Sequence, residues 1–145
     1  MRIERTVDLP CGADRAWAVL TDWERQAEWM RDADRVRVVS EHREGPGVRL
    51  AVRTRLFGIP AFTELMEVTW WDPPSGLAIQ HGGPVIGEGT WSLLPEGPAT
   101  RFTWVEDVRL SLPVFGEAAA WCYRPFMGML MRRAQEDLRR RIDRG

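Results

Sequence analysis

The sequence contains no lysine, and all twenty of its basic residues are arginine. Twenty-one acidic residues balance them, so the formal net charge is only −1. A chain without an excess of positive charge has no global field that would attract nucleic acid or an anionic membrane. We therefore expect neither partner, and we interpret the exclusive use of arginine as typical of a high-GC genome and not of a function.

Long hydrophobic runs are also missing. No stretch approaches the 18 consecutive apolar residues of a membrane span, and the first ten residues, MRIERTVDLP, lack the apolar centre of a signal peptide. The two cysteines, Cys11 and Cys122, lie far apart and have no metal-ligand spacing. Nothing indicates an oxidising compartment, although the pattern leaves a disulfide open. We expect a cytoplasmic protein.

The familiar catalytic motifs are absent as well. The two histidines, His42 and His81, lie outside any nucleophile motif, so neither a Ser-His-Asp nor a Cys-His arrangement is indicated. The chain has no HExxH, no CxxC, no Cys/His cluster for zinc and no glycine-rich phosphate loop. We therefore expect no metal and no cofactor.

A chain of 145 residues is most simply one domain, residues 1–145. At this length about 68–70% of the unfolded surface becomes buried, which is enough for a core and a cavity. Eight tryptophans are a high count. Because each indole is bulky and usually needs a hydrogen-bond partner when it is buried, we expect a wide, partly polar interior.

Alternation of apolar and polar residues predicts a sheet. RIERTVDL is the first strand, and ADRAWAVLTD and DWERQAEWM, with apolar residues at helical spacing, follow as two short helices. Six further alternating segments come next, separated by turn signals. Consecutive strands with short turns form an antiparallel sheet.

The last part of the chain predicts one long helix. It begins at Pro113, extends to about Asp143 and carries an apolar stripe, which it must bury on the inner face of the sheet. The expected fold is therefore α+β, with a curved antiparallel sheet of about seven strands around the long C-terminal helix. A strongly twisted sheet that curls around one helix leaves a space between them, where a ligand would lie.

Three segments carry a resemblance to a known family: ADRAWAVLTDWERQAEWM, MEVTWWDPPSGLAIQH and GTWSLLPEGPATRFTWVED. With the long terminal helix, they resemble the START-like polyketide cyclase/dehydrase and lipid-transport (SRPBCC) superfamily, over nearly the whole chain. The resemblance implies the helix-grip fold. That family includes carriers of hydrophobic ligands, aromatase/cyclases, hormone receptors, chaperone activators and quinone-binding proteins, and it shares no catalytic residue set.

Two strands place a glutamate on their more apolar side. Since side chains alternate across a strand, Glu64 shares a face with Phe62, Met66 and Trp70 in FTELMEVTWW, and Glu106 shares one with Trp104 in TRFTWVEDVRL. A one-residue bulge would reverse either assignment.

An unpaired buried carboxylate costs several kcal/mol, which leaves three outcomes for each glutamate. It pairs with an arginine such as Arg43, Arg124 or Arg133. It lies at the wet mouth of the pocket. Or an apolar site keeps it protonated, the state suited to proton transfer near neutral pH.

Three functions follow as hypotheses. The first is binding of a small, largely hydrophobic or aromatic molecule between sheet and helix. The second is a metal-free enzyme similar to the polyketide aromatase/cyclases, and the third is a partner-binding regulatory module with a degenerate pocket. In the enzyme, Glu64 or Glu106 would be the base and Tyr123 or His81 the proton donor. The ligand-binding candidates are Phe62, Met66, Trp70, His81, Trp104, Tyr123, Met127 and Leu130.

Overall fold

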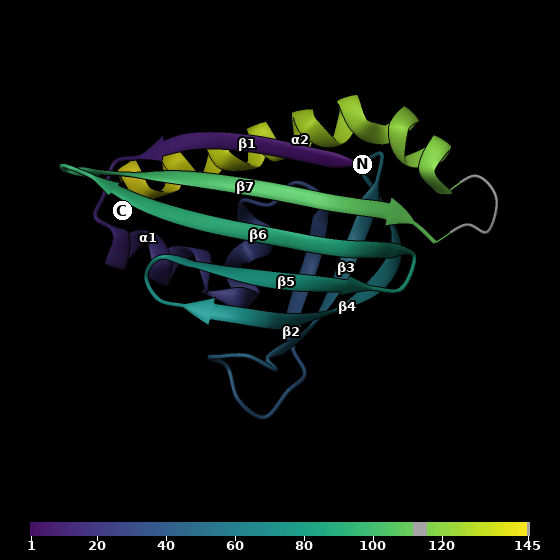
Figure 1. Ribbon diagram of the computed structural model, residues 1–145, viewed down its shortest axis with the longest axis horizontal. Coiled ribbons are helices and arrows are strands. Elements are labelled where there is room, and N and C mark those ends of the chain that lie inside the picture. The colour runs from purple at the N-terminus through teal and green to yellow at the C-terminus, as the bar shows by residue number, and fades with distance from the viewer. Residues whose placement is uncertain (112–115, 145) are drawn as a thin grey trace.

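One antiparallel sheet forms the body of the protein in the computed structural model, which describes residues 1–111 and 116–144. Within this part, seven strands pair in the order β1-β7-β6-β5-β4-β3-β2 (Figure 1). Strands β2 to β7 form a meander, and β1 closes against β7, so the predicted α+β fold is confirmed. The strands are β1 (Arg2–Leu9), β2 (Ala33–Val38), β3 (Arg49–Leu56), β4 (Ile59–Asp72), β5 (Gly76–Gly82), β6 (Val85–Glu96) and β7 (Ala99–Leu110).

Helices cover the inner face of this sheet. The two short ones after β1 are α1 (Ala13–Leu20) and a 3-10 helix, η1 (Trp23–Glu28). The long helix α2 (Gly116–Arg144) packs against β1 and β7 and is helical through Pro125. Its predicted start at Pro113 lies outside the described residues. No helix among the described residues is both long and apolar enough to cross a membrane.

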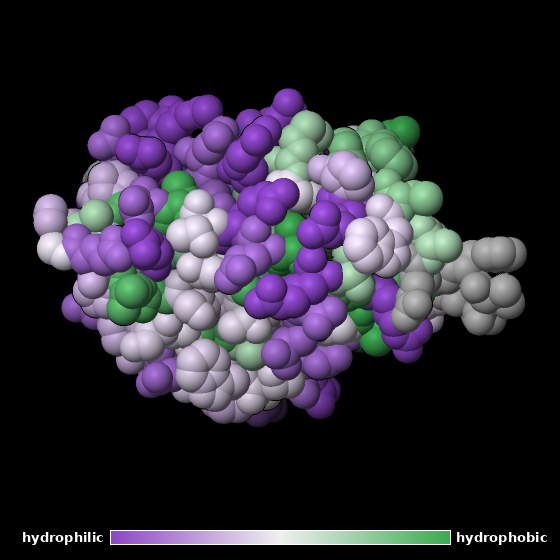
Figure 2. Space-filling model, turned by 45° about the horizontal axis from the view of Figure 1, so that its top comes forward, coloured by the Kyte–Doolittle hydropathy of each residue, from purple (hydrophilic) through white to green (hydrophobic). Residues whose placement is uncertain are grey.

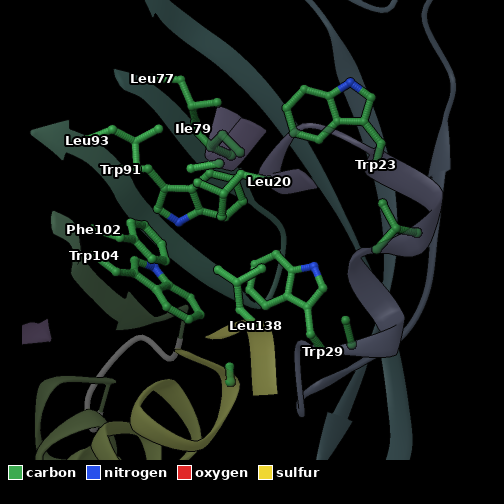
Figure 3. Packing of buried hydrophobic residues seen from close by; sticks show 14 of the residues in the cluster. Leu20, Trp23, Trp29, Leu77, Ile79, Trp91, Leu93, Phe102, Trp104 and Leu138 are labelled. Carbon is green, nitrogen blue, oxygen red and sulfur yellow. The ribbon is translucent and has the colours of Figure 1, made fainter. Parts of the chain in front are cut away.

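The two halves of α2 are buried to different degrees. Met131, Ala134, Leu138 and Ile142 in the C-terminal half are each at most 2% exposed and belong to the core. Their indole and phenyl neighbours on the sheet are drawn in Figure 3, where Leu138 lies between Trp29 and the rings of β6 and β7. In the N-terminal half, the described side chains from Trp121 to Met127, including Tyr123, are half-buried or exposed and form no comparable buried stripe. This half of the helix therefore covers a space above the sheet that its side chains do not fill.

A bulge in β4 reverses the side that its last residues face. The register with β5 shifts between Val68 and Trp70, so Val68 still points inward but Trp70 is 47% exposed on the outer face. Trp71 turns inward instead and packs edge-on against Trp17, with ring centroids 4.9 Å apart. The prediction that Trp70 binds the ligand is wrong, because the extra residue at the bulge breaks the alternation on which it rested.

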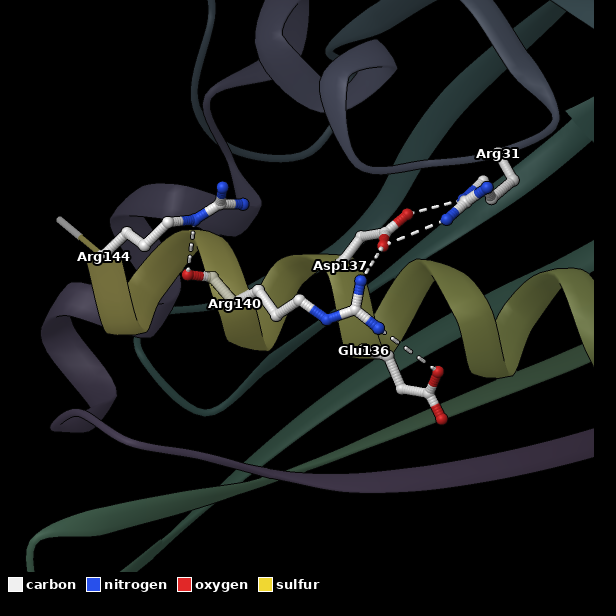
Figure 4. A network of polar contacts seen from close by, with 5 residues as sticks. All are labelled: Arg31, Glu136, Asp137, Arg140 and Arg144. Carbon is white, nitrogen blue, oxygen red and sulfur yellow. Dashed lines mark hydrogen bonds and ion pairs between the residues drawn. The ribbon is translucent and has the colours of Figure 1, made fainter.

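An ion-pair network joins the segment before β2 to the C-terminal half of α2 (Figure 4). The Nε and Nη2 of Arg31 donate to the two carboxylate oxygens of Asp137 at 2.5 and 3.1 Å. Asp137 also accepts a hydrogen bond from Arg140 at 3.4 Å. Bidentate pairs of this kind fix orientation as well as distance. The network thereby holds the segment just before β2, which includes Asp32, against the helix.

Candidate functional site

A cavity of about 410 Å³ lies between the inner face of the sheet and the N-terminal half of α2. Its volume is within the range of about 300–1,000 Å³ that is usual for ligand sites. Apolar side chains make up most of the wall, and the polar groups are few. Apart from Trp70, the structure places every site residue predicted from the sequence on this wall: Phe62, Glu64, Met66, His81, Trp104, Glu106, Tyr123, Met127 and Leu130.

His81 bridges the two predicted glutamates. Its Nδ1 lies 3.3 Å from Oε2 of Glu64 on β4, and its Nε2 lies 3.0 Å from Oε2 of Glu106 on β7. The indole N–H of Trp104 donates to the other oxygen of Glu106 at 2.8 Å. All three side chains of the Glu64–His81–Glu106 triad are at most 10% exposed. The triad is therefore a buried polar cluster in an otherwise apolar wall.

A glycine on β6 makes the triad possible. β6 lies between β5, which carries His81, and β7, which carries Glu106. Gly89 is the partner of Glu106 across the β6–β7 pair, and a Cβ atom at position 89 would be only 2.9 Å from Oε1 of that carboxylate. Gly89 is thus a point of close approach, with the carboxylate folded over the bare backbone.

Opposing effects set the charge of His81. Burial by itself lowers the pKa of its imidazole, but the adjacent Glu106 and Glu64 more than reverse this and raise the pKa to about 10. His81 is consequently an imidazolium at neutral pH, and both of its ring N–H groups donate to carboxylates. The triad is an ion cluster in which two carboxylates share one cation.

Of the three outcomes considered for the glutamates, the structure shows pairing, but with a different partner. The expected arginines lie elsewhere: Arg43 pairs with Glu24, Arg124 lies over the ring of Trp121, and Arg133 is exposed. The partner is His81, which the sequence suggested as a proton donor and a ligand-binding residue but not as the partner of the glutamates. Strand alternation placed the carboxylates inside, but it contained no information about which distant side chain would meet them.

Asp32 is a site residue that the sequence did not reveal. It lies just before β2 and lines the cavity. Burial and the charges of Glu106 and Glu64 raise the pKa of its carboxyl to about 6, against a smaller lowering by His81. In the sequence nothing distinguishes it from Asp34, two residues later, which pairs with Arg55 at 2.5 Å.

Tyr123 brings a phenol from α2 to the same wall. Burial and the charge of Asp32 raise its pKa to about 12, so the group remains a proton donor at neutral pH. The ring of Tyr123 also packs against Phe57 of the β3–β4 turn and Phe126 of α2, with centroids 5.5 and 5.3 Å away. This aromatic cluster connects the turn to the helix at one end of the cavity.

Exposed apolar side chains surround that end of the molecule. Phe57, Ile59 and Trp121 are 65%, 69% and 63% exposed. In Figure 2, apolar colouring gathers over the N-terminal part of α2, whereas the C-terminal part of the helix is covered by polar residues. The N-terminal part of α2, which covers this end of the cavity, therefore also carries much of the apolar outer surface in this view.

The described residues contain no group of three His, Cys, Asp or Glu side chains arranged to hold a metal ion. The geometry of the triad gives the physical reason at that position. Both ring nitrogens of His81 face carboxylates, and a doubly protonated imidazole has no lone pair to offer a metal. The polar cluster is thus suited to hydrogen bonding, charge pairing and proton transfer.

Comparison with known families matches residues 1–143 to the family model described as polyketide cyclase/dehydrase and lipid transport. Among curated protein sequences none matches the chain. The match covers every element of the sheet and nearly all of α2, so it includes each residue of the cavity wall.

Several solved structures share the fold. A protein from Thermus thermophilus has a TM-score of 0.80 at 22% identity, with 98% of this chain and 97% of that chain covered. A START superfamily protein from Mycobacterium smegmatis has a TM-score of 0.70 at 19% identity (99% and 97% covered). The Zhui aromatase/cyclase from Streptomyces sp. R1128 has a TM-score of 0.76 at 15% identity (99% and 94% covered). At these identities the likeness concerns the fold alone.

Proposed function

Because the chain belongs to the polyketide cyclase/dehydrase and lipid transport family, we propose that it binds a small, largely hydrophobic molecule in the cavity between the sheet and α2. The observation that carries this proposal is the cavity itself, about 410 Å³ in volume and mainly apolar. Burial of a ligand against such a wall releases about 25 cal/mol per Å² of apolar surface removed from water.

The wall combines rigid and adaptable side chains. Phe62 and Trp104 offer flat aromatic surface, while Met66 and Met127 have flexible, polarisable side chains that adjust to the shape of a ligand. The few polar groups, mainly the Glu64–His81–Glu106 triad and Asp32, would fix its orientation. The open volume supports this function over a partner-binding module with a degenerate pocket.

The proposal is tested by titration with the neutral fluorescent probe N-phenyl-1-naphthylamine. We expect a saturable increase in fluorescence with one site per chain. Leu130→Trp, which adds an indole to the wall, should weaken binding by about tenfold or more, equivalent to about 1.4 kcal/mol. Leu94→Trp makes the same change at a position that is 57% exposed on the outer face and should have no effect. A linear, unsaturable signal would contradict the proposal.

A second candidate function is metal-free acid–base catalysis on a poly-ketone, like that of an aromatase/cyclase. The specific observation in its favour is that Asp32, with a pKa of about 6, and the phenol of Tyr123 lie on the same apolar wall. A carboxylate that titrates near neutral pH is a suitable general base, and a phenol is a suitable donor to a developing enolate.

Turnover of a chemically supplied poly-ketone analogue tests this candidate. If the chain is an enzyme, Asp32→Asn should abolish turnover but leave binding of N-phenyl-1-naphthylamine unchanged. Glu64→Gln and Glu106→Gln test the original assignment of the base in the same assay. If the wild-type protein gives no product above background, catalysis is ruled out for that substrate class.

A further inference from the structure

The polar cluster on the cavity wall, formed by the Glu64–His81–Glu106 triad and Asp32, contains three acids and one histidine. Glu64 and Glu106 share the imidazolium of His81, and among the described residues no second cation pairs with either side chain. Asp32, on the same wall, adds a further negative charge when it is ionised. The cluster lies inside the cavity, where water screens its charges less than it would at the surface.

Some oxygen atoms on this wall accept few hydrogen bonds from the described residues. Glu64 is 2% exposed and uses only Oε2, toward His81; no donor from residues 1–111 or 116–144 reaches its Oε1. The carboxylate of Asp32 accepts a hydrogen bond from its own backbone N–H, and over the same ranges no other side chain donates to it. Thr54, also on the wall, has a buried hydroxyl without a partner among the described residues. Since buried polar atoms are normally paired, the Thr54 hydroxyl marks a place on this wall for a polar group from outside the chain.

The cations that line the cavity do not supply the missing charge. Arg55 is engaged by Asp34 at 2.5 Å. Arg109 belongs to the outward set of β7 and is exposed, and Met1 lies at the β1 end of the wall. Among the described residues, none of these groups forms an ion pair with the acids of the cavity. The wall therefore offers acceptors and negative charge to whatever enters.

We propose that the ligand carries a protonated amine, whose ammonium group binds beside Asp32 and Glu64 while its apolar part fills the remaining cavity. This inference rests on the function proposed above and adds the charge of the ligand to it. An ammonium has N–H donors and no acceptor, which complements a wall with acceptors left over. A carboxylate or phosphate ligand would instead meet like charge in a confined space.

Three probes with the same ring and different charge test the inference at pH 7 by calorimetry: 2-(1-naphthyl)ethylamine, 2-(1-naphthyl)ethanol and 1-naphthylacetate. We expect the amine to bind about tenfold or more tightly than the alcohol, the difference made by one hydrogen bond to a charged group. The acetate should bind more weakly than the alcohol.

Variants assign the preference to the two acids. Asp32→Asn and Glu64→Gln should each reduce the preference for the amine, measured as the ratio of the affinities for the amine and the alcohol. Glu88→Gln, which removes a carboxylate from the exposed face of β6, should keep the full preference. If Glu64→Gln fails to fold, Asp32→Asn still decides the question, because it removes a charge that is costly to bury.

The outcomes separate this inference from the function on which it rests. If the alcohol and N-phenyl-1-naphthylamine bind but the amine has no advantage, or if its advantage survives in Asp32→Asn, the inference is wrong and hydrophobic binding stands. Tightest binding of the acetate would overturn it as well. If none of the four probes binds, both proposals fall together.

Discussion

His81 is the residue that makes two buried carboxylates tolerable. Its raised pKa, about 10, shows how strongly Glu64 and Glu106 favour the imidazolium over the neutral ring. Asp32 has the opposite role: its carboxyl is held in a site that disfavours the charged form and raises its pKa to about 6. The same wall therefore contains a stabilised cation and a destabilised anion, which is the combination that an entering ligand would encounter.

The pKa of His81 predicts how stability depends on pH. The folded-state pKa of about 10 is above the unfolded value of about 6.5. Its stabilising contribution is thus fully present below about pH 6.5 and is lost as the pH rises toward 10. The burial of Asp32 acts in a separate window, because its penalty develops between about pH 4 and 6 and is constant above. We expect the free energy of unfolding, measured with urea, to fall between pH 7 and 10.

His81→Gln should remove most of this slope and lower stability at pH 7 by about 3 kcal/mol, since two buried carboxylates lose the one cation that pairs with them among the described residues. His42 provides the matched control, because it is exposed and its ring hydrogen-bonds to the carbonyl of Pro46, not to an acidic side chain. His42→Gln should leave the slope unchanged. An unchanged slope in His81→Gln would show that the imidazole is not the titrating group.

At the scale of elements, β6 shapes the site because it has no side chain at Gly89. Side chains from β5 and β7 meet over this strand because Gly89 leaves the space above its backbone free. The bulge in β4 is the second local device: it turns Trp71 into the core beside Trp17 and sends Trp70 outward. Both devices depend on one residue in a strand, and both decide which side chains reach the interior.

Gly89→Ala tests the first device. A Cβ atom at position 89 would be 2.9 Å from Oε1 of Glu106, so the carboxylate must move and its contact with His81 must lengthen. We expect a loss of about 1–3 kcal/mol in thermal or urea unfolding, the usual cost of overpacking. We also expect a pKa of His81 closer to its ordinary value, measured by NMR titration.

Gly12→Ala is the control, since no heavy atom lies within 4 Å of a Cβ atom there. Gly12 is the N-cap of α1, where alanine is less favourable than glycine, so Gly12→Ala should cost up to about 1 kcal/mol but leave the pKa of His81 unchanged. Wild-type stability and an unchanged His81 pKa in Gly89→Ala would contradict the role given to this glycine.

At the scale of the whole molecule, α2 has two functions along its length. Its C-terminal half is part of the core and is further held by the Arg31–Asp137 pair. Its N-terminal half covers the cavity and contacts the β3–β4 turn through the aromatic cluster of Phe57, Tyr123 and Phe126. A part of the fold with fewer buried contacts opens at lower free energy than the core does.

We therefore expect amide hydrogen exchange to be faster in residues 118–127 of α2 than in residues 131–142. Saturating N-phenyl-1-naphthylamine should slow exchange in the first segment and leave the second unchanged, because a ligand in the cavity adds contacts only to the covering half. β2, which lies at the far edge of the sheet from β1, serves as an internal reference. Equal exchange rates in both halves of α2 without the probe would contradict this division.

Local patterns in the sequence were enough to predict most of the fold and much of the site. Alternation and turn signals gave the seven strands and the long helix, and the resemblance to the family agreed with them. Alternation also placed Glu64 and Glu106 inside, because each assignment depends only on neighbouring residues in an unbroken part of a strand.

Tertiary structure decided the rest. The bulge that excludes Trp70 from the cavity comes from the pairing of β4 with β5, and periodicity within β4 contains no sign of it. The choice of His81 over an arginine as the partner of the glutamates depends on three strands meeting at Gly89. The burial of Asp32 depends on where α2 and the sheet enclose it. Each of these is a relation between residues far apart in the chain, and side-chain spacing along one strand or helix determines only relations between near neighbours.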